Sequence, residues 1–429
     1  MNLSSRSPLR WVPSLYFAMG LPFVVLNMVS AVLYKDLGIS DAQIAFWTSL
    51  IMWPWTIKFL WSPFLELYRT KKFWVVGSQL LSGVLFGVAA LSLHLPLFFA
   101  VSVAVFAVVA FSGATHDIAA DGVYMSELSP ASQAKYIGWQ GAFYNLAKLV
   151  ATGGLVWLAG WLYEGFSTSG TASFDAYVRS WTVVLLLLCV TLVALGLYHL
   201  RALPSGGSAS EGRSLRDGLS GLREVIGAFF TKRHIWYYIA FIILYRLGEG
   251  FVMKIVPLFL KADTASGGLG LTNQQIGLYY GTFGAGAFLI GSLLAGYYIA
   301  RRGLRRTLFT LCCIFNLPFG VYALLAWFQP SSMWLVGGGI VVEYFGYGFG
   351  GLTLFMMQQV APGRHQMAHY AFASGIMNLS VMLTGMASGF LSDLMSYRIF
   401  FLAVMLATIP AFVITRLVPF TYDDKPNDK

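Results

Sequence analysis

The chain has 429 residues, of which 57% are apolar and only 11% are charged, and its mean hydropathy is +0.69. A soluble domain does not need so much apolar surface, so the composition excludes an ordinary soluble enzyme and predicts an integral membrane protein. The net charge of +10 would suit a nucleic-acid partner. The basic residues gather, however, in short loops on one side of the predicted membrane, and this distribution argues against nucleic-acid binding.

Runs of about 20 apolar residues recur along the chain, and each can cross a hydrocarbon core of roughly 30 Å. The first run, 11–34, is too long for the apolar part of a signal peptide and is expected to be a retained span. About 20 of the 28 Lys and Arg residues lie on the side of the N-terminus, which places both termini in the cytoplasm. We predict an all-α membrane protein with twelve transmembrane helices, near residues 10–34, 42–65, 73–93, 95–123, 134–160, 180–201, 235–261, 273–300, 306–328, 332–358, 366–392 and 396–418.

The first two spans place polar residues at defined positions. Tyr16 and Asn27 fall on one face of span 1, and we expect them to contact a substrate. Ser40 and Gln43 form a capping box that opens span 2. Lys58 lies inside that span, where a charged side chain is costly and usually has a partner or a function.

Span 4 contains the most informative residues of the chain. Asp117 and Asp121 are four positions apart, so both carboxylates share one helix face within the membrane. We predict that Asp121 carries a proton and that Asp117 and Lys58 set its proton affinity; the alternative is a structural ion pair between Lys58 and Asp117. His116 is a candidate substrate contact, or else a satisfied interior histidine.

Span 5 has a polar stripe. Gln140, Tyr144 and Lys148 recur at every fourth position and are expected to contact substrate. Hydrogen bonding between helices is the alternative for such residues.

A polar stretch then divides the spans six and six. We predict an N-terminal bundle over 1–203, a cytoplasmic linker over 204–233 and a C-terminal bundle with a short tail over 234–429. The linker begins with Gly and Ser residues that favour flexibility. Its later part, 215–230, is predicted to be an amphipathic helix on the membrane surface.

The second half has its own intramembrane charges. Arg246 and Glu249 are three apart on span 7 and can pair on one face, and Lys254 follows on the same span. Arg246 and Lys254 are predicted to bind an anionic substrate, for which the planar guanidinium is well suited. Glu249 and Glu343, the latter on span 10, are expected to balance charge or share in proton coupling.

Two features of the first half recur in the second. The capping box of Ser40 and Gln43 returns as Thr272 and Gln275, and each opens the second span of its half. The cytoplasmic turns that follow are basic in both halves, and we expect them to act as gating loops that include Arg69, Lys72, Arg301, Arg302 and Arg305.

Other chemistry is not indicated. Cys189, Cys312 and Cys313 lie in apolar spans without metal-ligand or disulfide spacing. The sequence has no nucleophile elbow, phosphate loop or zinc-protease motif. We therefore expect no enzyme activity, no cofactor and no metal, and a monomeric protein.

Six plus six spans with repeated basic turns resemble the major facilitator superfamily. That family has Gly-x-x-x-(Asp/Arg)-(Arg/Lys)-x-Gly-(Arg/Lys)-(Arg/Lys) in these turns; residues 296–306 are similar to it, whereas the first turn has Pro63 where Gly is usual. The resemblance implies two helix bundles that rock about a central cavity lined by spans 1, 4, 7 and 10.

Two stretches narrow the resemblance. Residues 54–63, Pro-Trp-Thr-Ile-Lys-Phe-Leu-Trp-Ser-Pro, and 113–122, Gly-Ala-Thr-His-Asp-Ile-Ala-Ala-Asp-Gly, are similar to a signature pair of the peptide/acetyl-coenzyme A transporter branch. That branch includes AmpG-type muropeptide permeases. The resemblance implies proton-driven import of anhydro-muropeptides across the bacterial inner membrane, and such a large anionic ligand would suit Arg246, Lys254 or Lys148. His116 departs from the Gln that is commoner in this motif.

Three alternatives stay open. The same branch includes permeases for ferric siderophores, so a siderophore or another anionic nutrient is the nearest alternative cargo. An intramembrane acyl- or glycosyl-transferase that uses His116 and Asp117 as a base is more remote, because the sequence has no second catalytic cluster. A receptor or scaffold would need larger soluble surfaces than these short loops offer. The predicted partners are thus protons, an anionic muropeptide-like molecule and the lipid bilayer.

Overall fold

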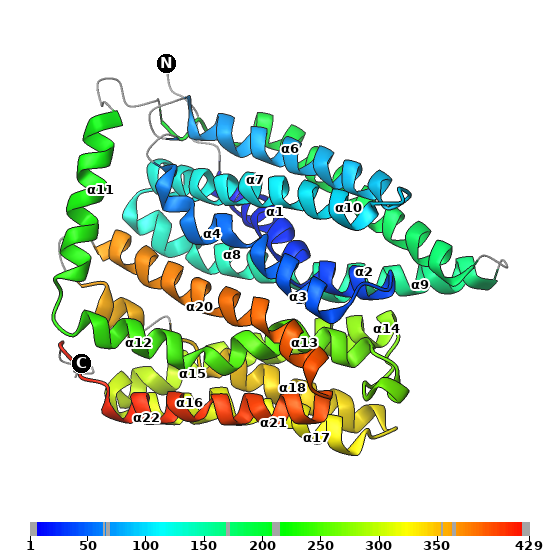
Figure 1. Cartoon of the computed structure of the whole chain (residues 1–429). Helices are drawn as coiled ribbons and strands as arrows, with labels where there is room; N and C mark the ends of the chain where they lie inside the picture. The colour runs from blue at the N-terminus through cyan, green and yellow to red at the C-terminus, as the bar shows by residue number, and fades with distance from the viewer. Residues whose placement is uncertain are drawn as a thin grey trace. The chain divides into compact units, whose positions relative to one another are not determined.

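The computed structural model describes residues 7–62, 65, 69–168, 172–207, 215–352, 355–362 and 366–422. Across these residues the protein is almost entirely helical and has no β-strand (Figure 1). Pro63 of the first motif, and residues 208–214 of the predicted linker, lie outside the described residues. The all-α prediction is confirmed.

The chain divides into two compact units. Unit 1 holds the residues up to Gly38 together with Ile51–Leu219, and unit 2 holds Ile39–Leu50 together with the residues from Ser220 onward. One boundary therefore falls within the stretch 204–233. The segment Ile39–Leu50 packs with unit 2, although the residues on both sides of it in the chain belong to unit 1.

In unit 1, the long helices pack in a continuous series: α10 on α6, α6 on α7, α7 on α1, and α1 on α8. Their shared core is apolar and includes Leu15, Val75 and Val123. The elements are η1 (Pro8–Arg10), α1 (Val12–Val24), the π-helical turn η2 (Val25–Val29), α2 (Ser30–Asp36), α4 (Trp53–Ile57), η3 (Lys58–Leu60), α6 (Lys71–Ser92), α7 (Phe98–Glu127), α8 (Pro130–Leu149), the π-helical turn η4 (Val150–Leu155), α9 (Val156–Thr168) and α10 (Ser173–Ala202).

Unit 2 is built around the packing of α15 on α18 and of α20 on α3 and α13. Helix α11 (Leu215–Phe230), most of which belongs to this unit, covers the residues for which an amphipathic helix is predicted. The other elements are α3 (Asp41–Leu50), α12 (Ile235–Tyr245), α13 (Leu247–Lys261), η5 (Thr264–Ser266), α14 (Asn273–Ile276), the π-helical turn η6 (Gly277–Phe283), α15 (Gly284–Arg302), α16 (Leu304–Asn316), η7 (Leu317–Phe319), α17 (Gly320–Phe328), α18 (Met333–Phe349), the π-helical turn η8 (Met356–Val360), α20 (Gln366–Leu394), α21 (Tyr397–Ala407) and α22 (Ile409–Leu417).

Nine helical stretches among the described residues are long and apolar enough to cross a membrane. Each of the other three predicted spans is interrupted: span 2 between α3 and α4, span 7 at Arg246 between α12 and α13, and span 10 at Gly350 after α18. Broken helices leave backbone groups without helical partners, which membrane proteins tolerate where protein or a polar cavity surrounds them. The interrupted spans are those that carry Lys58, Arg246 and Glu343.

The predicted capping box at Thr272 forms, and the one at Ser40 forms in part. The Thr272 hydroxyl accepts from the backbone N–H of Gln275, and the Gln275 side chain accepts from the Thr272 backbone at 2.9 Å. At span 2, the Ser40 hydroxyl accepts from the Gln43 backbone at 3.4 Å but donates to the Gln43 side chain at 3.3 Å. The Gln43 side chain therefore accepts from the Ser40 hydroxyl, whereas in a complete capping box it would accept from the Ser40 backbone N–H.

Lys232 fastens the turn between α11 and α12 to the end of η8. Its ammonium donates to the carbonyl oxygens of Val360, Ala361 and Pro362 at 2.7, 3.1 and 2.8 Å. The last carbonyls of a helix lack helical donors, so a cation at this position stabilises them.

We expect Lys232→Met to lower the thermal unfolding midpoint of the purified protein by about 2–4 °C for each kcal/mol lost. Three carbonyl oxygens would lose a charged donor in this variant. Lys232→Arg keeps both the charge and the N–H groups and should retain most of the stability. Equal midpoints for wild type and Lys232→Met would show that the three contacts contribute nothing.

Candidate functional site

The two carboxylates of α7 bind different neighbours within unit 1. Asp117 Oδ2 accepts from the indole N–H of Trp55 at 2.9 Å and lies 3.6 Å from Lys58 Nζ. Asp121 Oδ1 accepts from the Tyr16 hydroxyl at 2.9 Å. The structure brings Lys58 to Asp117, as the ion-pair interpretation predicts, and adds a separate aromatic donor for each acid.

Asp117 is 9% exposed, and its second oxygen, Oδ1, is buried and has no hydrogen-bond donor among the described residues. Buried polar atoms nearly always have partners, so an orphaned carboxylate oxygen is unfavourable unless a proton or a ligand fills the position. A proton can therefore be held at this oxygen as well as at the predicted carrier Asp121, one turn further along α7.

Trp55 reaches Asp117 across Gly113, one turn earlier on α7. A Cβ atom at Gly113 would lie 2.7 Å from Cζ2 of the Trp55 ring. The close approach of the indole to α7 thus requires a residue without a side chain.

We expect Gly113→Ala to destabilise the protein by about 1–3 kcal/mol, because the added methyl group overpacks the Trp55 ring. Gly77→Ala on α6 is the matched control, since a Cβ atom there meets nothing within 4 Å. Gly77→Ala should stabilise its helix by up to about 1 kcal/mol. Thermal unfolding of the two variants would measure this; equal effects would contradict the Trp55 contact.

The other predicted residues of unit 1 lie in different surroundings. Tyr144 is near enough to interact electrostatically with both carboxylates. Asn27 lies in η2 and Lys148 at the end of α8, just before η4, and these two π-helical turns pack on each other. Gln140 is half-buried on α8. His116 does not join the carboxylates, because its ring lies 2.9 Å from the side-chain nitrogen of Gln79 on α6.

In unit 2, the predicted pair of Arg246 and Glu249 forms at the interruption of span 7. The guanidinium donates to both oxygens of Glu249, which is fully buried. Glu249 occupies the edge of the guanidinium formed by Nε and one terminal nitrogen, so an anionic ligand that binds Arg246 must displace Glu249 or use the other edge. Lys254 is buried beneath α3, with its ammonium 3.4 Å from the carbonyl oxygen of Thr48.

Glu343 is buried among tyrosines. Its Oε2 accepts from the Tyr322 hydroxyl on α17 at 2.9 Å. The adjacent Tyr344 ring meets Tyr280 edge-on, with 5.0 Å between centroids. Sequence spacing did not identify Tyr322 or Trp55, because each lies on a different helix from the acid that it contacts. Tyr16 was predicted as a substrate contact, and the structure places its hydroxyl on Asp121.

The predicted gating residues lie at helix ends and contact aromatic rings or backbone. Lys72 donates to the Leu203 carbonyl at 3.0 Å and so ties α6 to the segment after α10. Cations stacked on rings at helix ends are also typical of interface anchors. These stacked pairs are Arg69 with Phe73, Arg301 with Tyr297, Arg302 with Tyr298 and Arg305 with Phe420.

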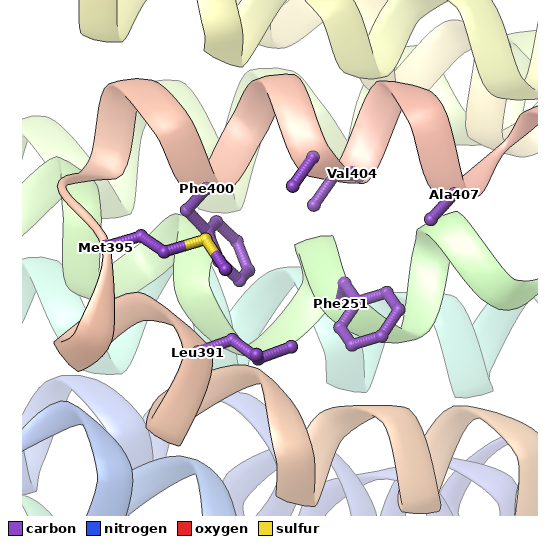
Figure 2. Close-up of a pocket in the computed structure, with 7 residues that line it drawn as sticks. Phe251, Leu391, Met395, Phe400, Val404 and Ala407 are labelled. Atoms are coloured by element: carbon purple, nitrogen blue, oxygen red, sulfur yellow. The ribbon is translucent and has the colours of Figure 1, made fainter.

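Unit 2 also contains an apolar pocket of about 110 Å³ between α13, α20 and α21 (Figure 2). Its lining has no charged or hydrogen-bonding side chain, so it does not suit an anionic ligand. The lining residues are Phe251, Leu391, Met395, Phe400, Ala403, Val404 and Ala407. Across the described residues, no group of three or more His, Cys, Asp or Glu side chains could hold a metal.

Comparison with known proteins agrees with this architecture. A model of the Major Facilitator Superfamily matches residues 242–429. The anhydromuropeptide permease of Escherichia coli K12 is 24% identical over 415 residues, covering 93% of this chain and 77% of the permease.

Solved transporter structures share the fold. The D-xylose–proton symporter superposes with a TM-score of 0.70 at 12% identity, covering 97% of this chain and 99% of the symporter. The nucleoside transporter NupG gives a TM-score of 0.67 at 14% identity, covering 98% of this chain and all of NupG. The chain therefore has the fold of these transporters, matches the Major Facilitator Superfamily model over residues 242–429, and is similar in sequence to an anhydromuropeptide permease.

Proposed function

We propose that this transporter imports anhydro-muropeptides together with protons across the bacterial inner membrane. The observation that carries the proposal is the pair of carboxylates on α7, a helix long and apolar enough to cross a membrane, where Trp55, Lys58 and Tyr16 contact them. Similarity to the E. coli permease supports the choice of cargo.

In this mechanism Asp121 takes up the proton, and Asp117 and Lys58 hold the neighbouring charge. A carboxylate that binds a proton becomes neutral, which removes the cost of carrying a charge through a low-dielectric interior. Tyr16 favours the charged form of Asp121 by donating to it, so the proton is held reversibly. Glu249 and Glu343 share the coupling from unit 2.

The substrate is anionic, and we assign its charged group to span 7. A substrate carboxylate can replace Glu249 on Arg246, because both present the same pair of oxygens to the guanidinium. Lys254 supplies a second cation, and Lys148, Gln140, Tyr144 and Asn27 remain candidate contacts.

The topology completes the proposal. We assign the N-terminal bundle to 1–203, the cytoplasmic linker to 204–233 and the C-terminal bundle to 234–429, with both termini in the cytoplasm. Arg69, Lys72, Arg301, Arg302 and Arg305 would hold the cytoplasmic ends. We propose that the monomer transports without covalent chemistry on its substrate.

The test is uptake of labelled anhydro-muropeptide into proteoliposomes, with and without an inward proton gradient. We expect uptake above that of protein-free liposomes, stimulated by the gradient and lost when an ionophore collapses it. Uptake without stimulation would overturn proton coupling. No muropeptide uptake by folded protein, with uptake of a ferric siderophore or another anionic nutrient, would overturn the cargo.

A further inference from the structure

A continuous chain of hydrogen-bonded side chains crosses the core of unit 1. Ser14 Oγ on α1 lies 2.9 Å from His199 Nε2 on α10, and His199 Nδ1 lies 2.8 Å from Gln79 Oε1 on α6. The other end of that amide, Gln79 Nε2, lies 2.9 Å from His116 Nε2 on α7. Four residues thereby join four helices, which Figure 1 shows together in the N-terminal unit.

This series of hydrogen-bonded side chains is shielded from water. His199, Gln79 and His116 are 0%, 2% and 4% exposed, and the gap beside Gln79 and His116 is too narrow for a water molecule. The side chains must therefore satisfy one another.

The Gln79 amide fixes the direction of the chain. Its oxygen accepts from Nδ1–H of His199, and its NH₂ group donates to Nε2 of His116, so His116 carries its proton on Nδ1. His199 Nε2 then accepts from the Ser14 hydroxyl. In this arrangement both imidazoles are neutral and each link has one donor and one acceptor.

A second contact between the same outer helices closes a ring. Tyr16 lies two residues after Ser14 on α1, and Asp121 lies five residues after His116 on α7. The Tyr16 hydroxyl donates to Asp121 at 2.9 Å. Hydrogen bonds thus run from α1 through α10 and α6 to α7, and back to α1 at the proposed proton site.

We infer that Ser14, His199, Gln79 and His116 are positioning residues, which hold α1 and α7 at the spacing and rotation that keep Tyr16 on Asp121. The inference rests on the proposed function only in treating Asp121 as the proton site. The inference makes His116 part of this hydrogen-bonded series and not a substrate contact. Loss of a hydrogen bond in this series should therefore change the proton affinity of Asp121. The effect would act through Tyr16, although the altered residue does not contact the carboxylate.

The charged and titratable groups around Asp121 are few. Lys58 comes from η3, Tyr16 from α1, Tyr144 from α8, and Asp117 and Tyr124 from α7 itself. Lys71 of α6 packs against the next residue of α7, Gly122. Tyr16 is the group among them that donates a hydrogen bond to Asp121 in the described structure.

The same pair of helices offers a matched control. Ser82 on α6 donates to Ser112 on α7 at 2.9 Å, and Ser112 donates to the Ser78 carbonyl at 2.8 Å. These bonds also join α6 to α7, but they do not continue to α1. Ser112→Ala should therefore cost stability without affecting the contact between Tyr16 and Asp121.

The test measures protonation of Asp121 without any substrate. In the purified full-length protein, the infrared C=O stretch of the protonated carboxyl group is titrated against pH and assigned by its loss in Asp121→Asn. We expect Tyr16→Phe to raise the titration midpoint of Asp121 by about 1–2 pH units, because the carboxylate loses a hydrogen bond that favours its charged form. Gln79→Met should shift it in the same direction by at least about 0.5 unit.

The decisive comparison is the double variant. If Gln79 acts through Tyr16, then Gln79→Met should add less than about 0.2 unit in the Tyr16→Phe background, because coupled residues are non-additive. Ser112→Ala should leave the midpoint unchanged. Additive shifts, an unchanged midpoint in Gln79→Met, or an equal shift in Ser112→Ala would each overturn the inference.

A milder variant tests the same inference if Gln79→Met does not fold. Ser14→Ala removes the half-buried end of the chain and should shift the midpoint with the same sign, while Ser14→Thr keeps the hydroxyl and should restore it. Failure of muropeptide uptake would contradict the proposed function and leave these titrations untouched. Normal uptake with unshifted midpoints would contradict the positioning chain alone.

Discussion

Asp121→Asn is expected to abolish accumulation of substrate against its gradient. Asn retains an oxygen for the Tyr16 hydroxyl but cannot take up a proton, so the imposed gradient no longer drives uptake. With one proton per substrate, each pH unit of gradient supports about tenfold accumulation, and the variant should fall to a ratio near one. Exchange of labelled for unlabelled substrate should continue, because exchange needs no net proton movement.

Glu127→Gln is the control for that experiment. Glu127 lies at the end of the same helix, where its side chain accepts from the Gly206 backbone at 2.7 Å, and Gln keeps such an oxygen. We expect this variant to accumulate substrate normally. Full accumulation by Asp121→Asn would remove Asp121 as the proton carrier, and loss of the folded protein would assign it a structural role.

Glu249→Gln is expected to destabilise the protein by about 3 kcal/mol, the lower end of the range for a buried pair, because it leaves the Arg246 guanidinium, 14% exposed, without its counter-charge. Replacing both partners, in Arg246→Met with Glu249→Met, should restore most of the stability, since a buried ion pair can be exchanged for apolar side chains at little cost. The measurement is thermal unfolding of the three proteins in detergent.

Transport separates the structural role of this pair from its proposed functional one. The double variant should fold and still fail to take up the anionic substrate, because no guanidinium remains to bind it. Normal uptake by the double variant would show that Arg246 does not contact substrate. Full stability of Glu249→Gln would show that the pair contributes nothing to folding.

Features that depend on a few neighbouring residues could be predicted from the sequence. The spacing of Asp117 and Asp121 places both on one face of α7, and that of Arg246 and Glu249 leads to a pair. The capping motif at Thr272 forms because its partners are three residues apart. Span lengths follow from the thickness of the bilayer, which limits where an apolar helix can end.

Contacts between distant helices could not be predicted in this way. Helical spacing says which residues share a face but not which helix lies opposite, so Trp55 and Tyr322 were not predicted, and Tyr16 was predicted as a substrate contact and not as a donor to Asp121. His116 was expected near substrate and instead bonds Gln79 in the core. No local signal indicates that residues 39–50 pack with unit 2, because that depends on the close fit of α3 against α20.

The local pairing of Arg246 with Glu249 bears on how span 7 enters the bilayer during synthesis. On insertion scales, a charged residue near the middle of a helix raises the free energy of membrane insertion by roughly 2.5–3.5 kcal/mol. An apolar residue lowers it by only about 0.3–0.6 kcal/mol. A span with three charges is therefore a poor candidate for insertion by itself. Residues three apart can meet as soon as one helical turn has formed, before any other span is present. Two of the three charges can thus be neutralised while the nascent segment is leaving the translocation channel.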